Sequence, residues 1–250
     1  MTGMLDYDRE ADHYDVTRGG DARAASAAAA VRALLPPDTT RLADLACGTG
    51  IVTVRLTRPG RQVIGIDLSS GMTRIAATRL PGRITIGDVT RLPLADASMD
   101  AVVMIWLLHL MNAPAGAAAL TEVARVLRPG GTLLTTVDKN DAVFATDDDT
   151  TALIKPVRAA YAAPQTDATG RVTDLGAPLG LTVTGENAFP GTGQGRSPRR
   201  WREHLLAGAF TWAKAAGDDL TALCERLQAL PDQDRPRPDP VYRLLRLTKV

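Results

Sequence analysis

A short apolar segment that runs directly into closely spaced glycines most constrains the fold of this chain. Residues 42–46 read Leu-Ala-Asp-Leu-Ala, and residues 47–50 read Cys-Gly-Thr-Gly. Glycines after a strand let a ligand approach the backbone, and a helix that begins there would offer free N–H groups. Two bound species fit such a turn: a dinucleotide pyrophosphate, or the amino-acid end of S-adenosylmethionine (SAM). The dinucleotide pattern requires a third glycine, where this chain has Thr53.

The first 138 residues alternate apolar segments with amphipathic segments. Strands are predicted at residues 42–46, 62–67, 83–87, 101–106 and 132–137. Helices are predicted at residues 21–35, between the glycine turn and Pro59-Gly60, from Ser69 or Ser70 to Leu80, and around residues 120–127. This alternation predicts an α/β fold with a Rossmann-like doubly wound sheet, mostly parallel, with helices on both faces. Ligands of such sheets bind beyond the carboxyl ends of the strands.

Beyond residue 138 the pattern is weaker. Helices are predicted at residues 150–163, 198–212 and 218–230, and strands at 181–184 and 241–249, the last of them antiparallel. Residues 189–198 hold three glycines and two prolines, which predicts a loop.

Two acidic residues close the second and third predicted strands. Asp67 lies 19 residues after Gly48, where a carboxylate can accept hydrogen bonds from both hydroxyls of an adenosine ribose. NAD enzymes use the same device, so Asp67 indicates an adenosine ribose without naming the cofactor. Asp88 can accept from the adenine amino group. The simpler alternatives are that Asp67 caps the following helix and that Asp88 stabilises a turn.

The ordered set of motifs resembles that of the class I SAM-dependent methyltransferases, in particular the UbiE-like group that acts on small molecules. The resemblance extends over about residues 5 to 140. The matching segments are Asp-Leu-Ala-Cys-Gly-Thr-Gly at 44–50, Gly-Ile-Asp-Leu-Ser at 65–69, Gly-Asp-Val at 87–89, Asp-Ala-Val-Val at 100–103 and Glu-Val-Ala-Arg-Val-Leu-Arg-Pro-Gly-Gly at 122–131.

The resemblance implies a SAM site in which the glycine turn holds the methionine portion. Asp44 and the backbone near Ala46, Gly48 and Gly50 would contact that portion. Ile105 would lie beneath the methionine chain. The cofactor that the resemblance implies is therefore SAM, bound at the end of the first strand.

The resemblance also implies how the adenosine portion would be held. Asp67 would bind the ribose, and Leu68 and Met72 would flank the adenine. Asp88 and the Val89 amide would recognise the edge of the adenine.

The segments outside the central motifs are assigned by the same resemblance. Residues 1–36 would form N-terminal cap helices over the cofactor, in which Tyr14 and Arg18 would meet the methionine carboxylate. Residues 37–250 would form the SAM-binding α/β domain, and residues 138–240 would contain the helices of a substrate lid.

Candidate bases for catalysis are few, because the chain has three histidines. His109 follows the fourth strand at the cofactor end of the sheet and is the first catalytic candidate. The alternative is a structural histidine whose ring forms hydrogen bonds with backbone groups. His13 lies in the cap beside Tyr14 and is the second candidate. An acceptor amine needs only to be neutral, whereas a hydroxyl usually needs a base, so N- and O-methylation both remain open. Apolar residues stand where catechol-type enzymes carry magnesium ligands, so no metal is expected.

Composition narrows the class of protein. A formal net charge of +1 is too small to indicate binding to nucleic acid or to an acidic membrane surface. Two distant cysteines, Cys47 and Cys224, with no signal peptide or membrane span, indicate a cytoplasmic protein. The partner that the resemblance implies is a small-molecule substrate. Cys47 is expected to be a packed side chain. The predicted function is therefore SAM-dependent methyl transfer to a small molecule. The alternative functions are those of an NAD-dependent oxidoreductase and of a non-catalytic SAM-binding module, and the sequence does not indicate an oligomeric state.

Overall fold

The computed structural model describes residues 6–250 and divides into two compact units. The first unit contains the chain up to Lys139, residues 166–189 and residues 242–250. The second unit contains residues 140–165 and 190–241.

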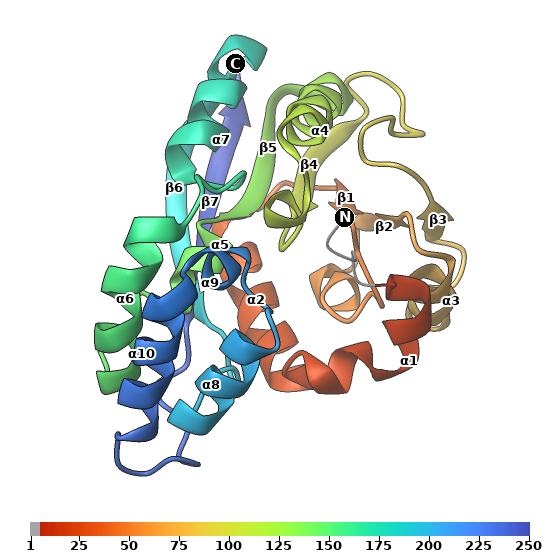
Figure 1. Cartoon of the computed structure of the whole chain (residues 1–250). Helices are drawn as coiled ribbons and strands as arrows, with labels where there is room; N and C mark the ends of the chain where they lie inside the picture. The colour runs from red at the N-terminus through yellow and green to blue at the C-terminus, as the bar shows by residue number, and fades with distance from the viewer. Residues whose placement is uncertain (1–5) are drawn as a thin grey trace. The chain divides into compact units, whose positions relative to one another are not determined.

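The first unit is built on the predicted sheet. Among the described residues the sheet has seven strands in the order β3-β2-β1-β4-β5-β7-β6, and Figure 1 shows β5, β7 and β6 side by side. Strands β1 to β5 pair in parallel, and β7 pairs antiparallel with β5, which confirms the predicted fold class. The strands are β1 (Arg41–Leu45), β2 (Gln62–Asp67), β3 (Ile84–Ile86), β4 (Met99–Met104), β5 (Leu127–Val137), β6 (Leu181–Pro190) and β7 (Val241–Lys249).

The strand order creates a switch point between β1 and β4. The chain moves outward from β1 through β2 to β3, and then returns to the other side of β1 to form β4 and β5. Right-handed crossovers on opposite sides of β1 place their connecting helices on opposite faces of the sheet. The central strand β4 is buried along all six of its residues, as expected for a parallel strand covered on both faces. The carboxyl ends of β1 and β4 therefore flank the crevice where ligands of this architecture bind.

Helices and short 3-10 turns connect the strands of the first unit. Side chains cap the N-termini of three of the helices: Asp6 accepts a hydrogen bond from the Arg9 amide, Ser69 from the Met72 amide, and Asn112 from the Ala115 amide. The helices are α1 (Tyr7–Thr17), α2 (Gly20–Leu34), α3 (Ser70–Arg79), α4 (Ala113–Val126) and α7 (Thr169–Gly176). The 3-10 turns are η1 (Thr53–Leu56), η2 (Leu108–Leu110) and η3 (Ala177–Leu179).

The helix expected after the glycine turn is replaced by the short 3-10 turn η1. The sequence there is Ile51-Val52-Thr53-Val54, and β-branched residues lose side-chain freedom in a helix. The hydroxyl of Thr53 donates to the carboxylate of Asp44 at 2.6 Å, which further ties this segment to β1. The prediction of a regular helix was wrong, so binding by a helix N-terminus does not apply at this turn.

Two other sequence predictions are corrected. The fourth strand ends at Met104 and not at Trp106, because Trp106 has a left-handed backbone with φ of 57°. The single helix predicted over residues 198–212 is two helices, separated at Gly208, whose φ is 68°. Helix α7 was not predicted.

The second unit is a small helical bundle. Its core consists of large apolar side chains, among them Phe144, Ile154, Trp201, Trp212 and Leu227. Its helices are α5 (Lys139–Ala142, whose first residue belongs to the first unit), α6 (Asp149–Tyr161), α8 (Pro198–Leu206), α9 (Thr211–Ala215) and α10 (Gly217–Gln228).

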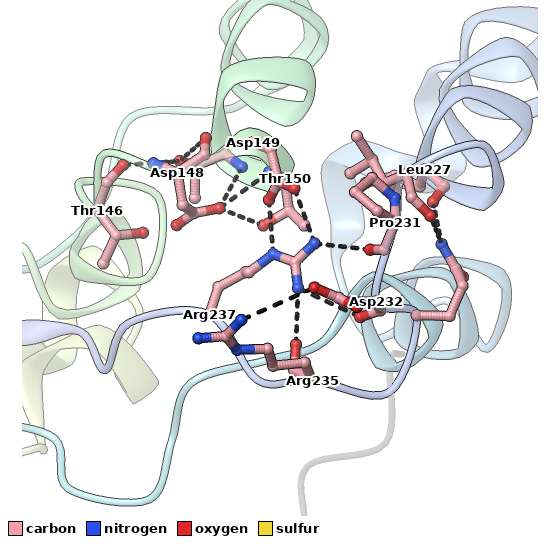
Figure 2. Close-up of polar contacts among 12 residues, drawn as sticks. Thr146, Asp148, Asp149, Thr150, Leu227, Pro231, Asp232, Arg235 and Arg237 are labelled. Atoms are coloured by element: carbon pink, nitrogen blue, oxygen red, sulfur yellow. Dashed lines mark hydrogen bonds and ion pairs between the residues drawn. The ribbon is translucent and has the colours of Figure 1, made fainter.

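Arg237 anchors the irregular segment after α10 to the start of α6 (Figure 2). Its guanidinium donates to both carboxylate oxygens of Asp149, at 2.6 and 2.7 Å, and to the carbonyl of Pro231 at 3.0 Å. The neighbouring Asp148 caps α6 by accepting from the amides of Thr150 and Thr151. Only 12% of the Arg237 side chain is exposed, so this pair is more shielded from water than an ordinary surface ion pair.

We expect substitution of Arg237 to destabilise the second unit. Arg237→Gln should lower the free energy of unfolding by about 2 kcal/mol, between the values typical of exposed and buried ion pairs. Arg199→Gln is the matched control, because Arg199 pairs with Asp234 with 56% and 76% of the two side chains exposed. It should cost less than about 1 kcal/mol. Urea unfolding would measure both, and equal losses would contradict the assigned role of Arg237.

Candidate functional site

Backbone strain marks the carboxyl edge of the sheet. Ala46 follows β1, Trp106 lies two residues after β4 and Asp138 follows β5, and these three non-glycine residues have φ of 54°, 57° and 51°. A left-handed conformation costs a non-glycine residue about 1 kcal/mol or more, and such residues cluster at functional sites. The amide of Trp106 is held by the Thr136 hydroxyl at 2.7 Å. Three neighbouring strands therefore end in constrained backbone at one edge.

The glycine turn is bonded directly to the acid that ends the next strand. The Gly48 amide donates to one carboxylate oxygen of Asp67 at 2.8 Å, and the Ser69 amide donates to the other at 2.9 Å. Gly48 and Gly50 both have positive φ, and a Cβ on Gly50 would lie 3.1 Å from the Cβ of Ala76. The structure thus brings the two principal predicted motifs together, and glycine is required at position 50 by conformation and by space.

The second predicted acid lies at the neighbouring strand end. Asp67 is in register with Ile86, and the Gly87 amide donates to the Asp67 carbonyl at 3.0 Å. Asp88 therefore begins the loop next to Asp67. Its Oδ1 accepts from the amide and the hydroxyl of Thr90, both at 2.8 Å, so that oxygen stabilises the turn. Burial raises the pKa of Asp67, although backbone amides that donate to it act in the opposite direction.

Exposed apolar side chains lie beside the two acids. Leu68 is 69% exposed and Ile86 is 59% exposed, which is high for large aliphatic side chains. Ile86 was missed by the sequence analysis, although its position before Gly87-Asp88 could have indicated it. Met72 is 2% exposed and Val89 is 9% exposed, so these two predicted residues present little surface to a ligand.

Asp44 lies at the switch point and is almost fully buried. Its carboxylate is 2% exposed and accepts a hydrogen bond from the Thr53 hydroxyl at 2.6 Å. Burial raises the pKa of Asp44 to about 7, and the charge of Asp67 acts in the same direction. Ile105, also predicted, is 6% exposed directly after β4. Asp44 therefore changes charge near neutral pH.

Helix α1 is fastened to α3 and to the glycine turn by acidic side chains. Asp8 accepts from the Gly71 amide at 2.8 Å, and a Cβ on Gly71 would lie 2.7 Å from the Asp8 carbonyl oxygen. Asp15 pairs with Arg79 at 2.7 Å and accepts from the Thr49 hydroxyl at 2.6 Å. The predicted N-terminal helix therefore lies against the edge that carries Asp67, and α1 and α3 lie side by side in Figure 1.

The predicted cap residues differ in their surroundings. Burial raises the pKa of Tyr14, which the charge of Asp67 raises further, so Tyr14 lies within electrostatic reach of that acid. Arg18 ends α1, is exposed, and lies 5.8 Å from the Tyr14 ring centre. His13 is exposed on α1.

His109 lies in η2, close to several cationic side chains. It is half-buried, and its Nδ1 atom is buried without a hydrogen-bond partner. Burial lowers the pKa of His109 to about 2, and the positive charges of Lys139, Arg23 and Arg18 lower it further. Its imidazole is therefore neutral at physiological pH and is a weak base.

Two other predictions concern reactive and metal-binding groups. Cys47 is buried, and burial raises the pKa of its thiol, which agrees with a packed side chain. Within residues 6–250, no three His, Cys, Asp or Glu side chains gather as a metal site would require. No helix in that part of the chain is long and apolar enough to cross a membrane.

Comparisons with known proteins agree with this geometry. Residues 43–135 match the family described as a methyltransferase domain. Demethylmenaquinone methyltransferase of Mycobacterium tuberculosis (strain H37Rv) is 42% identical over 108 residues, which are 42% of this chain and 45% of that protein. The chain thus spans less than half the length of this curated relative.

Solved structures extend the likeness over nearly the whole chain. A SAM-dependent methyltransferase of Thermotoga maritima, described as a possible histamine N-methyltransferase, superimposes with a TM-score of 0.57 at 19% identity and covers 98% of both chains. The [4+2]-cyclase SpnF superimposes with a TM-score of 0.56 at 21% identity, over 97% of this chain and 93% of that one. At these identities the likeness concerns the fold.

The sheet order, the glycine turn bonded to Asp67 and the match over residues 43–135 point to the same class of protein. Residues 43–135 are similar to the methyltransferase domains of the class I SAM-dependent enzymes. SAM is the cofactor of this class.

We expect the contact between α1 and the glycine turn to depend on Asp15. Asp15→Asn should weaken the bonds to Arg79 and Thr49 and lower the free energy of local opening by about 1–2 kcal/mol, because the lost partners are charged or partly buried. Hydrogen exchange of amides 48–50 would report this change. Asp12→Asn is the control, because Asp12 pairs with Arg74 on exposed surface, and it should leave those amides unchanged.

Proposed function

We propose that this chain transfers the methyl group of SAM to a small-molecule acceptor, by N- or O-methylation of a metabolite. The observation that carries the proposal is the Asp67 carboxylate, held against the Gly48 amide at the end of β2. That arrangement puts an acceptor for ribose hydroxyls beside a turn that a ligand can approach closely. The site belongs to the first unit alone.

In this proposal the cofactor lies along the edge formed by β3, β2 and β1. Asp67 binds the ribose, Leu68 and Ile86 contact the adenine, and Asp88 with the Val89 amide recognises its edge. Asp88 keeps one carboxylate oxygen for this purpose, since only Oδ1 is used by Thr90. The exposure of Leu68 and Ile86 supports the adenine assignment, because a bound purine would cover both side chains.

The methionine portion of SAM would lie over the glycine turn. Asp44 would face its ammonium group, and Ala46, Gly48 and Gly50 would supply backbone contacts. Tyr14 and Arg18 from the cap would meet the carboxylate. The sulfonium already makes the methyl group electrophilic, so the protein's task is to align a nucleophile with the carbon–sulfur bond. Alignment alone can lower the barrier by about 7–11 kcal/mol.

The lid, the cap and two histidines are the predicted parts of the site that would contact the acceptor. The lid assigned to residues 138–240 and the cap assigned to residues 1–36 stay predictions, and residues 1–5 lie outside the described residues. His109 and His13 stay predicted catalytic residues. A neutral His109 can form a hydrogen bond to the methyl acceptor, but the low pKa of its imidazole favours a methyl acceptor that needs no strong base. The relative named demethylmenaquinone methyltransferase supports a small organic acceptor.

The first test compares cofactors. SAM and S-adenosylhomocysteine (SAH) should raise the melting temperature, and NAD should not, because residue 53 is threonine and not the third glycine. Asp67→Ala should weaken SAH binding at least about tenfold by calorimetry, through loss of the charge-assisted bonds to the ribose. Stabilisation by NAD and not by SAH would contradict the assignment.

A panel of amines, phenols and acids then separates an enzyme from a binding module. SAH detected by mass spectrometry with any acceptor identifies transfer, whereas binding without turnover identifies a non-catalytic SAM-binding protein.

The second test uses the pKa of Asp44. Below pH of about 7 Asp44 is neutral and attracts the ammonium of the ligand weakly, and above it the carboxylate is formed. SAH affinity should therefore rise as pH increases from 6 to 8, by up to roughly tenfold. Asp44→Asn should bind more weakly and lose this dependence. Identical pH profiles for the two proteins would remove Asp44 from the ammonium site.

A further inference from the structure

A buried arginine in α2 has no acidic partner among the residues that the structure describes. Arg23 is 6% exposed, and its guanidinium donates to the Arg18 carbonyl at 2.9 Å. Its Cζ lies 3.6 Å from the ring centre of Trp106, which is close for a cation–π contact. No carboxylate among residues 6–250 forms an ion pair with Arg23. Burial of an unpaired charge is unfavourable, and burial lowers the pKa of this guanidinium.

Three polar atoms around this arginine are buried without hydrogen-bond partners in the described part of the chain. They are Nε of Arg23, Nε1 of Trp106 and Nδ1 of His109. Arg23 stacks on Trp106, and its charge lowers the pKa of His109, so the three residues form one neighbourhood. Buried polar atoms nearly always form hydrogen bonds in folded proteins. Three buried nitrogen atoms without partners in one place therefore indicate that a polar ligand binds there.

The position of this cluster distinguishes it from the adenosine site. Trp106 follows β4, and its ring centre lies 5.8 Å from that of Phe189 in β6 and 6.2 Å from that of Tyr242 in β7. Asp67, Leu68 and the glycine turn lie at the ends of β2 and β1. The strand order separates the two sets, because β4 through β6 form one half of the edge and β1 through β3 the other. All of these residues belong to the first unit.

We propose that Arg23 binds an ionised oxygen of the methyl acceptor, so that the acceptor is an acidic hydroxyl compound or a carboxylic acid that enters as its anion. This inference rests on the proposed function and specifies its substrate class. The acceptor would lose its proton to solvent before it binds beside the guanidinium. The oxygen would then form a bond to the methyl carbon as the carbon–sulfur bond breaks, and the bonding electrons would go to sulfur, giving SAH and a methyl ether or ester. No protein base is needed, which fits the weak basicity of His109.

The test uses 4-nitrophenol as a probe, because its phenolate absorbs visible light, with 4-nitroanisole as the uncharged analogue. The probe is titrated into SAH-loaded protein across neutral pH. Arg23 should lower the pKa of the bound phenol by about one unit, equal to a tenfold preference for the anion. The uncharged analogue should bind at least about tenfold more weakly at a pH where the probe is ionised.

Variants assign the effect to Arg23. Arg23→Met should abolish the preference for the anion while SAH affinity stays within about twofold, and it should not lower the melting temperature of the ligand-free protein, because it removes an unpaired buried charge. Arg23→Lys, which keeps the charge, should retain part of the preference. Arg32→Met is the matched control on the exposed face of the same helix and should change nothing. If Arg23→Met fails to fold, the Arg23→Lys titration decides.

Three results would overturn the proposal. Equal affinity for the phenol and its methyl ether in wild-type protein would exclude an anion site. A loss of SAH affinity in Arg23→Met with an unchanged phenol preference would assign Arg23 to the cofactor carboxylate. A lower melting temperature without any change in the phenol titration would make Arg23 a structural cation. If wild-type protein bound neither SAM nor SAH, the proposed function itself would fail, and that result is separate from the phenol titration.

Discussion

The hydrogen bond between the Gly48 amide and the Asp67 carboxylate organises the cofactor edge of the sheet. It joins the turn after β1 to the end of β2, at 2.8 Å, and thereby fixes the carboxylate on which a ribose would depend. The same acid bonds to the Ser69 amide at the start of α3, and α3 in turn holds α1 through Arg79 and Asp15. The Thr49 hydroxyl in the glycine turn also donates to Asp15 at 2.6 Å, so the turn, α3 and α1 form one connected network of bonds.

The elements that sequence predicted well are those with a strong local signal. Strands β1 and β2 appear near their expected positions because buried apolar runs bounded by glycine, proline and acidic residues are unambiguous. Strand β5 ends where expected but begins at Leu127 and not at residue 132. Asp67 and Gly48 were expected to meet because both follow parallel strands, and the structure joins them. The helix after the glycine turn was wrong because its β-branched residues and the bond from Thr53 to Asp44 favour a shorter turn.

The residues that sequence missed depend on tertiary contacts. Arg23 lies in an alanine-rich helix that reads as an ordinary amphipathic segment, and only the fold brings its guanidinium onto Trp106. Ile86 looks like a core residue of a strand, yet β3 is the edge strand and leaves it 59% exposed. Asp100, quoted among the motifs, lies at the opposite end of β4, where it pairs with Arg128 and bonds to the backbone of β1. A shared motif therefore mixes residues of the site with residues that only hold the sheet.

Backbone strain and polar groups without hydrogen bonds occur together at the edge formed by β4 to β6, where we propose that the acceptor binds. Trp106 combines a left-handed backbone, an orphan indole N–H and a stacked guanidinium. The left-handed backbone and the orphan indole N–H each cost stability, and such strained residues cluster at functional sites. Backbone strain at Ala46 can be explained by the cofactor turn, but the unpaired charge of Arg23 lies beyond the adenosine half. A negatively charged acceptor, the ligand class proposed for this cluster, would accept hydrogen bonds from the guanidinium and from the indole N–H.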